Sequence, residues 1–440
     1  MRRFVVFIVA VLLFTVSASA QQMNNVDRDR MRGMLKATSG DIAKYFYDPE
    51  LKGLDWKALT AEADEKIKQA KTPSEAITAI SLFVDKLQDS HTRLIPPSRA
   101  GRPVFGFAAK MFGDEARIYQ VKPGSNADKA GLQAGDRILQ IFGYRPERKS
   151  FDDAMFYYRV LHPMPELKIT YQRGSAPPQT VSVAAKVKVA QTSLEIIDIY
   201  RLLMDEDENE RYFYGAFDGD IGYLQLPSFG AERLPIPDIA TPHAFVLDLR
   251  GNPGGRVDSL GDFAGHFTTK DGILNNMIFR KKTEAVKIKP HGDRFNVPLF
   301  ILVDSRSASA AEIFARYFQK TGQAKIIGDT SSGKVNTSLY YPEQVGAGSV
   351  VPFGVQIAIA RVAFEDGEEL EHHPVVPDYP CLPTEADLRS QADPCLKKAV
   401  ALARKAAGRT EELPEKVADQ VEKAIAQRNE YIAEQLKRPD

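Results

Sequence analysis

The sequence is poor in the residues that build disulfide scaffolds and metal fingers. Its 440 residues include only two cysteines, Cys381 and Cys395, and seven histidines. Two cysteines are too few for a disulfide-rich scaffold, and no histidine lies at finger-like spacing from either one. We therefore expect no metal and no cofactor. In an oxidising compartment we expect a single bridge between the two cysteines, with two free thiols as the alternative.

The chain also lacks an excess of either charge, since it has 58 basic and 58 acidic side chains. This balance argues against a general basic surface for nucleic acid or anionic lipid, so partners should be chosen by local sites. No low-complexity tract or repeat array is visible. The length is enough for two or three ordinary folded cores.

The only strongly apolar run that could be mistaken for a membrane span lies at the N-terminus, directly after Arg2 and Arg3. Residues 4–16 are too few to cross a bilayer comfortably, and small residues follow at 18–20. This pattern predicts a signal peptide cleaved after Ala20, with an uncleaved anchor as the alternative. We expect the mature protein in the periplasm or the medium, with 56 basic and 58 acidic side chains and a formal charge of −2.

The remaining chain changes character along its length. Residues from about 21 to 95 have helical spacing, and Thr72 before Pro73 marks a helix start. Residues from about 103 to 185 favour short strands and turns. From about 210 to 405, apolar strands alternate with helices, which is an α/β pattern. The charged tail beyond Glu411 has helical spacing and should pack on the body or on a second subunit.

The α/β part gives specific expectations. Strands are expected near residues 221–226, 244–249, 297–303 and 325–327, and helices near 257–267 and 309–321.

The middle segment carries a recognisable motif. Strands are expected over residues 118–121 and 137–141, with a short helix over 126–130 and a left-handed stop at Gly131 between them. Residues 121–139 read VKPGSNADKAGLQAGDRIL. This run resembles the central signature of bacterial PDZ domains. The resemblance implies that Phe105, Gly106 and Phe107 form the loop that binds a peptide carboxylate, beside a strand edge to which the peptide adds.

Ser309 is the candidate nucleophile. It lies where the apolar run 298–303 gives way to a helix, so its hydroxyl should be exposed among unpaired backbone N–H groups. An acyl-transfer nucleophile needs such surroundings because its tetrahedral intermediate carries an oxyanion. Ser309 and Glu312 also have the spacing of an ordinary capping box, so this segment alone does not establish catalysis.

Two further segments strengthen this interpretation. The apolar run 245–249 ends in Arg250 and the glycine-rich turn 251–255, a suitable place for a second oxyanion donor. Phosphate binding is disfavoured there because the nucleotide-binding spacings are missing. Lys334 follows another strand and a polar turn, 25 residues after Ser309.

In this order the segments resemble the C-terminal processing peptidases, also called tail-specific proteases. The resemblance covers nearly the whole mature chain, including residues 89–92 and a late Val376-Pro377-Asp378 segment. It implies an α/β core related to the crotonase and Clp-protease spiral, with a helical N-terminal segment and an inserted PDZ domain. It also implies that Ser309 is the nucleophile, Lys334 the general base, and Gly255 and Ala310 the oxyanion donors.

The implied division of the chain has five parts. They are a signal peptide (1–20), a helical N-terminal domain (21–100), a PDZ domain (101–186), a peptidase core (187–408) and a charged C-terminal helix (409–440).

The sequence departs from the family at the base. Ser338 stands where a supporting glutamine is common, and Asp329 would oppose deprotonation of Lys334 if it touched the amine. Ser90 and His91 resemble the pair of the tricorn-type branch, so His91, oriented by Glu371, is the alternative base.

The predicted activity is hydrolysis of exported proteins, with the PDZ domain capturing free C-termini of protein or peptide substrates. The rival hypothesis is a PDZ scaffold protein that has lost catalysis. No nucleic-acid or metal partner is expected, and a homo-oligomer is compatible with the sequence.

Overall fold

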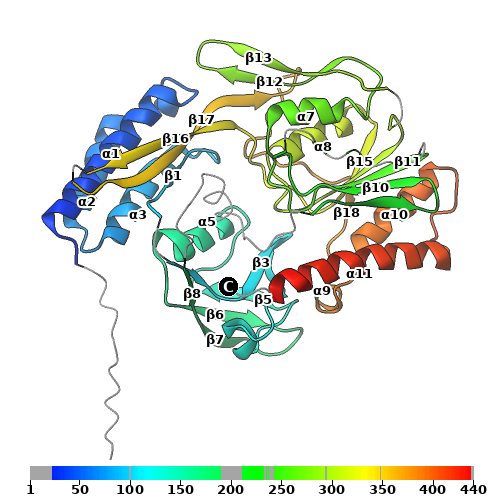
Figure 1. Cartoon of the computed structure of the whole chain (residues 1–440), viewed down its shortest axis with the longest axis horizontal. Coiled ribbons are helices and arrows are strands. Elements are labelled where there is room, and N and C mark those ends of the chain that lie inside the picture. Colours follow the sequence, from blue (N-terminus) through cyan, green and yellow to red (C-terminus); the bar gives the residue numbers. More distant parts are fainter. Residues whose placement is uncertain are drawn as a thin grey trace, which may run out of the picture.

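The computed structural model describes residues 22–98, 101–189, 211–231, 234, 236, 242–292, 295–346 and 348–437. The predicted signal peptide lies outside these residues. Within them, no helix has both the length and the apolar character that crossing a membrane requires. The helices and strands form three parts around a common centre: N-terminal helices, a small all-antiparallel sheet and a larger α/β core (Figure 1).

The N-terminal part is a helical layer. The predicted helix start is confirmed, because the Thr72 hydroxyl accepts a hydrogen bond from the N–H of Glu75. Apolar side chains of the layer, Ile77 and Ile80 among them, are buried together with side chains of a long β-hairpin. Its elements are α1 (Asn25–Tyr45), η1 (Leu51–Gly53), α2 (Trp56–Gln69), α3 (Pro73–Val84) and η2 (Asp85–Leu87).

The small sheet is inserted after β1 (Arg93–Ile95) through a two-stranded neck, in which β2 (Gly101–Val104) pairs antiparallel with β8 (Lys186–Val189). Its strands follow the order β3-β4-β5-β6-β7. The predicted strands and short helix of the 121–139 motif are present, and Gly131 has a positive φ of 81°. The elements are β3 (Phe107–Phe112), β4 (Glu115–Val121), α4 (Asn126–Lys129), β5 (Arg137–Ile141), α5 (Phe151–Phe156), η3 (Tyr157–Leu161), β6 (Glu166–Gln172) and β7 (Gln179–Ala184).

The core contains a six-stranded sheet in the order β18-β15-β14-β11-β10-β9, parallel except for β9 at its edge. The four predicted strands correspond to β10, β11, β14 and β15. All side chains of β10, β11 and β14 are buried, as expected of strands covered on both faces. The strands are β9 (Phe213–Phe217), β10 (Ile221–Gln225), β11 (Ala244–Asp248), β14 (Leu299–Val303), β15 (Ala324–Gly328) and β18 (Tyr379–Pro380).

Helices cover both faces of this sheet. Leu299, Ile301 and Val303 pack with α7 (Val257–Ala264) and α8 (Ala310–Lys320), the two predicted helices. Phe300 and Leu302 face α10 (Pro394–Ala406) and the tail helix α11 (Glu415–Lys437). The tail helix therefore packs on the body of its own chain. The short helix α9 (Glu385–Ser390) precedes α10.

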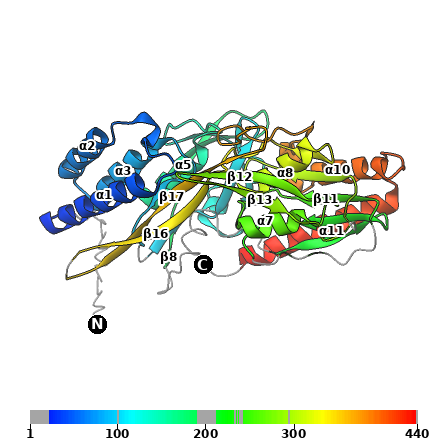
Figure 2. The same ribbon diagram turned by 90° about the horizontal axis from the view of Figure 1, so that it is seen from above.

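A second sheet joins the N-terminal helices to the core. Its long strand β17 (Val351–Ala363) pairs with β1, with β16 (Thr337–Val345) and with β12 (Gly272–Phe279), which in turn pairs with β13 (Thr283–Ile288). In the turned view, β12 and β17 lie between the helical layer at one end and the core sheet at the other (Figure 2).

Candidate active site

Ser309 occupies the turn between β14 and α8, as the sequence predicts. Its backbone has φ 56° and ψ −120°, a left-handed conformation that non-glycine residues rarely adopt. The N–H of Ser309 donates to the carbonyl of Lys334, with N···O 2.8 Å. A strained backbone at such a turn is characteristic of functional sites.

Two backbone donors flank this turn. Among the described residues, neither the N–H of Ala310 nor the N–H of Gly255 has a hydrogen-bond acceptor. Gly255 is solvent-exposed and Ala310 begins α8. Within the described part of the chain, the two N–H groups that the family resemblance implies as oxyanion donors are thus free.

The glycine-rich turn that carries Gly255 packs directly on the Ser309 turn. A Cβ atom on Gly254 would lie 2.6 Å from Cβ of Ser309, and one on Gly255 would lie 2.3 Å from the carbonyl carbon of Phe229. Both glycines also have positive φ angles, 97° and 148°. Only glycine fits at either position.

Glu312 does more than cap α8. Its buried carboxylate accepts hydrogen bonds from the N–H groups of Ser309 (3.2 Å), Gly333 (2.7 Å) and Lys334 (2.9 Å), and from the hydroxyl of Ser331. Burial raises the pKa of Glu312 to about 7, against the opposing effect of these donors. Only the capping-box spacing is visible in the sequence, because the partners at 331–334 follow a further strand, β15.

Lys334 is tied to the site by its backbone. Its carbonyl and N–H bind Ser309 and Glu312, whereas its partly buried ammonium has no hydrogen bond or ion pair to any described residue. Asp329 does not oppose it directly, because the Asp329 carboxylate accepts from the N–H of Gly113 and from Arg148. The Ser338 hydroxyl accepts a hydrogen bond from Gln356.

His91 belongs to a hydrogen-bonded relay. Its Nδ1 lies 2.8 Å from Oγ of Ser90, and that hydroxyl donates to Oε2 of Glu371 at 3.0 Å. The Glu371 carboxylate also accepts from the N–H groups of Ser90 (2.9 Å) and Val335 (3.0 Å). Since Val335 follows Lys334, the relay adjoins the segment that holds the backbone of Ser309.

The electrostatics of the relay favour a neutral imidazole and an ionised carboxylate. Burial lowers the pKa of His91 to about 4, with Arg93 and Lys334 acting in the same direction against Glu371. The two backbone donors and Ser90 lower the pKa of Glu371 below its usual value and outweigh its burial. The neighbouring Asp89 carboxylate is held in place as well, since it accepts hydrogen bonds from the Thr92 hydroxyl and the Asn336 amide.

The predicted peptide-binding loop, residues 105–107, lies at the start of β3 in the small sheet. Gly106 has φ 82°, and a Cβ there would lie 2.2 Å from Cβ of Ser125. Phe105 and Phe107 are buried. Phe107 begins β3, which pairs on one side with β4 and is an edge strand among the described strands.

Residues 109–111 of β3 contact the segment 304–306, which precedes Ser309. Arg306 donates to the carbonyl of Ala109 (2.9 Å), and the Ser305 hydroxyl donates to the carbonyl of Met111 (2.6 Å). Lys110 forms an ion pair with the buried Asp304 at 2.5 Å, which holds the pKa of that carboxyl well below its usual range despite burial. The sequence contains no signal for these contacts.

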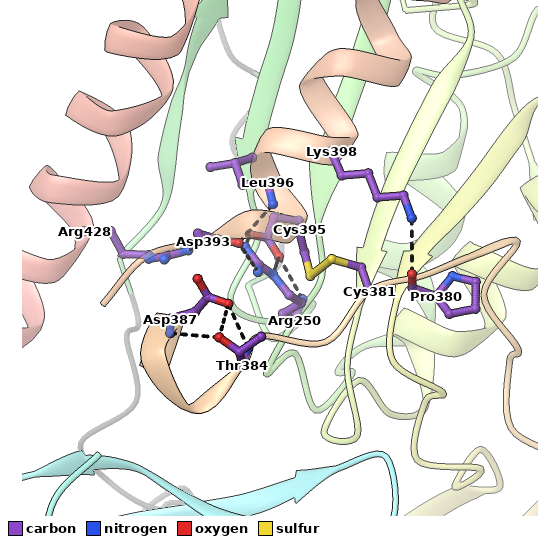
Figure 3. The surroundings of a disulfide bond; sticks show 11 residues. Arg250, Pro380, Cys381, Thr384, Asp387, Asp393, Cys395, Leu396, Lys398 and Arg428 are labelled. Carbon is purple, nitrogen blue, oxygen red and sulfur yellow. Dashed lines mark hydrogen bonds and ion pairs between the residues drawn. A yellow bond between two sulfur atoms is a disulfide. The ribbon is translucent and has the colours of Figure 1, made fainter. Parts of the chain in front are cut away.

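On the face of the core sheet that α10 covers, the expected disulfide joins Cys381 and Cys395, with Cα atoms 5.7 Å apart (Figure 3). The adjacent Asp393 caps α10 and accepts from both Arg250 and Arg428. Arg250 also binds Asp248 and directly precedes the glycine-rich turn. A buried ionic network therefore supports the turn that carries Gly255.

Comparison with known families agrees with this geometry. Residues 220–381 match the model described as peptidase family S41, and residues 117–145 match the model of a PDZ domain. The chain is a serine-type peptidase similar to peptidase family S41. Its curated relatives are carboxyl-terminal processing proteases, and it carries a PDZ domain. The fold class is confirmed as an α/β S41 peptidase fold with a PDZ domain and a helical N-terminal segment.

Relatives support the same grouping. The chain is 26% identical over 348 residues to a carboxyl-terminal-processing protease of a Picosynechococcus species, covering 73% of this chain and 79% of that protein. It is 22% identical over 398 residues to the carboxy-terminal processing protease CtpA of Bacillus subtilis, covering 85% and 78%. The fold is similar to that of a CPAF mutant, with a TM-score of 0.66 at 13% identity, covering 89% of this chain and 100% of that one.

Proposed function

We propose that this peptidase is an exported endopeptidase that cleaves proteins by acyl transfer, with Ser309 as the nucleophile. The observation that carries the proposal is the strained Ser309 turn beside two N–H groups, of Gly255 and Ala310, that lack an acceptor among the described residues. A substrate carbonyl oxygen bound by these donors would be stabilised as it becomes an oxyanion.

His91 is the base that the hydrogen bonding favours. The single hydroxyl proton of Ser90 is directed to the ionised Glu371, so Ser90 Oγ must accept the Nδ1 proton of His91. The neutral imidazole then keeps a lone pair on Nε2, which is the tautomer that takes a proton from a serine. In this reading Ser90 and Glu371 orient the imidazole.

Lys334 is the second candidate, in a Ser–Lys dyad. Its supporting observation is an ammonium that no described acceptor holds, attached to a backbone that binds both Ser309 and Glu312. As the general base, Lys334 would take the proton of the Ser309 hydroxyl when that oxygen attacks the substrate.

The PDZ domain is proposed to capture the free C-terminus of an unstructured substrate. The carboxylate would bind at Phe105, Gly106 and Phe107, and the peptide would add along β3. The contacts of Ser305 and Arg306 with β3 carbonyls support competition between that peptide and the segment preceding Ser309.

We propose these limits for the five parts of the chain: signal peptide 1–20, helical N-terminal domain 21–100, PDZ domain 101–186, peptidase core 187–408 and charged C-terminal helix 409–440. The mature protein is proposed to act in the periplasm or the medium, on protein or peptide substrates.

The experiment compares cleavage of an unfolded protein by four purified proteins: wild type, Ser309→Ala, His91→Ala and Lys334→Ala. We expect Ser309→Ala and His91→Ala to lower kcat by about 10³-fold or more, with Lys334→Ala far less affected. Equal residual activity in wild type and Ser309→Ala would instead favour the inactive PDZ scaffold. Loss in Lys334→Ala with full turnover in His91→Ala would establish the dyad.

A further inference from the structure

Three potential metal ligands meet at the C-terminal end of α7, outside the catalytic region. Asp262 and His266 lie four residues apart, and His291 follows β13. One ligand atom from each of the three side chains lies within 4.8 Å of the other two. His291 Nε2 is 2.9 Å from Asp262 Oδ1, and the His266 and His291 rings stack with centroids 4.5 Å apart.

The backbone holds the two contributing segments together. The N–H of His291 donates to the carbonyl of Gly265 at 2.9 Å. A Cβ on Gly265 would lie 2.0 Å from the carbonyl oxygen of Lys289, and one on Gly261 would lie 2.8 Å from that of Lys287. These two glycines, one helical turn apart, let α7 approach the backbone of 287–289. Main-chain packing therefore brings the ligands together.

We propose that Asp262, His266 and His291 form a binding site for a divalent transition metal, with Zn²⁺ the best match. Two imidazoles and one carboxylate suit Zn²⁺, which accepts nitrogen and oxygen donors in a tetrahedral shell. A water molecule would fill the fourth position, since the site is partly solvent-exposed. The metal would fasten the end of α7 to the segment after β13, and it takes no part in peptide hydrolysis.

This cluster is not evident from the sequence, because His291 lies 25 residues beyond His266 and the hairpin of β12 and β13 separates them. Another exposed histidine offers a matched comparison. His243 also pairs with an aspartate, Asp220, at 2.7 Å, but that carboxylate is bound by Arg409 and no second histidine takes part. His243 therefore reproduces the His–Asp pair without the third ligand.

The test titrates ZnCl₂ into the purified, chelator-treated protein by isothermal calorimetry, with thermal unfolding as a second readout. We expect one saturable site and a higher Tm with zinc, because a ligand that binds only the folded state stabilises it. His266→Ala, His291→Ala and Asp262→Asn should each weaken zinc binding by more than about tenfold. His243→Ala should bind as wild type does.

Asp262→Asn and His291→Ala change exposed side chains, so they keep the test decisive if His266→Ala fails to fold. The proposal is overturned if the wild type binds no zinc, or if binding is unchanged in Asp262→Asn and His291→Ala. A spectrum of the bound metal that lacks histidine nitrogen would overturn it as well.

Discussion

At the scale of the residue, Glu312 links the nucleophile turn to the segment that carries Lys334. Its carboxylate is the common acceptor of three backbone N–H groups and one hydroxyl. These hydrogen bonds reduce, without cancelling, the cost of burying a charge. The site therefore contains a buried acid whose pKa is raised from its usual value to about 7.

This raised pKa predicts a pH-dependent stability. The unfolded chain releases the Glu312 proton near its ordinary pKa of 4.5, whereas the folded protein keeps it until about 7. The folded state thus binds more protons in this window, and its stability falls as pH rises from about 4.5 to 7. Glu312→Gln should remove this component, which amounts to about 3 kcal/mol at pH 8 relative to pH 4.5.

Urea unfolding of wild type and Glu312→Gln between pH 5 and 8 measures this difference, and the exposed Glu430→Gln serves as control. Parallel stability curves for wild type and Glu312→Gln would contradict the prediction.

Individual site residues were only partly predictable from the sequence. Ser309 and Gly255 could be located because strand-to-helix turns and glycine runs are local signals. The three donors to Glu312 at residues 331, 333 and 334 could not, because they reach it through the parallel pairing of β14 with β15. The relay from Ser90 to Glu371 joins residues 281 positions apart, so only the family resemblance suggested it.

At the scale of the element, the glycine-rich turn between β11 and α7 determines where Ser309 can lie. Replacing Gly254 by alanine adds a Cβ that overlaps the Ser309 turn, in addition to the strain of a positive φ. We expect Gly254→Ala to lower kcat by about 10²-fold, as a misplacement of about 1 Å does.

Gly143→Ala is the matched control for this substitution. Gly143 also has a positive φ, 86°, but its new Cβ would meet no atom within 4 Å. It should cost about 1 kcal/mol of stability and leave kcat unchanged. Equal kcat losses in both variants, measured under saturating substrate, would count against the packing argument.

The elements themselves were the most predictable level. Buried parallel strands such as β11 and β14 have continuous apolar runs, and α8 begins after a clear polar turn. The long strand β17 was missed, because its pairing with β1, β12 and β16 joins distant segments and leaves no short-range signal.

At the scale of the whole molecule, the small sheet and the core meet at β3. Arg306 donates to the Ala109 carbonyl and to the Tyr119 hydroxyl, and so occupies part of the strand to which a peptide would add. We expect Arg306→Ala to tighten binding of a peptide with a free apolar C-terminus by about fivefold, since one competing hydrogen bond is worth roughly 1 kcal/mol.

Fluorescence anisotropy of a labelled peptide measures this affinity, with a C-terminally amidated peptide as the negative probe. Arg316→Ala, which breaks the ion pair of Arg316 on α8 with Glu368, is the matched control and should bind as wild type does. Unchanged or weaker peptide affinity in Arg306→Ala would contradict competition at β3.

The neck formed by β2 and β8 has a practical consequence for engineering. The chain enters and leaves the inserted module on two strands that lie side by side, with Gly101 opposite Val189. A foreign recognition module with adjacent ends could therefore be grafted at this junction without moving β1 or the catalytic scaffold. Such chimaeras would keep the neck of β2 and β8 and exchange the surface that contacts residues 304–306. Substrate choice and control of cleavage could then be designed separately.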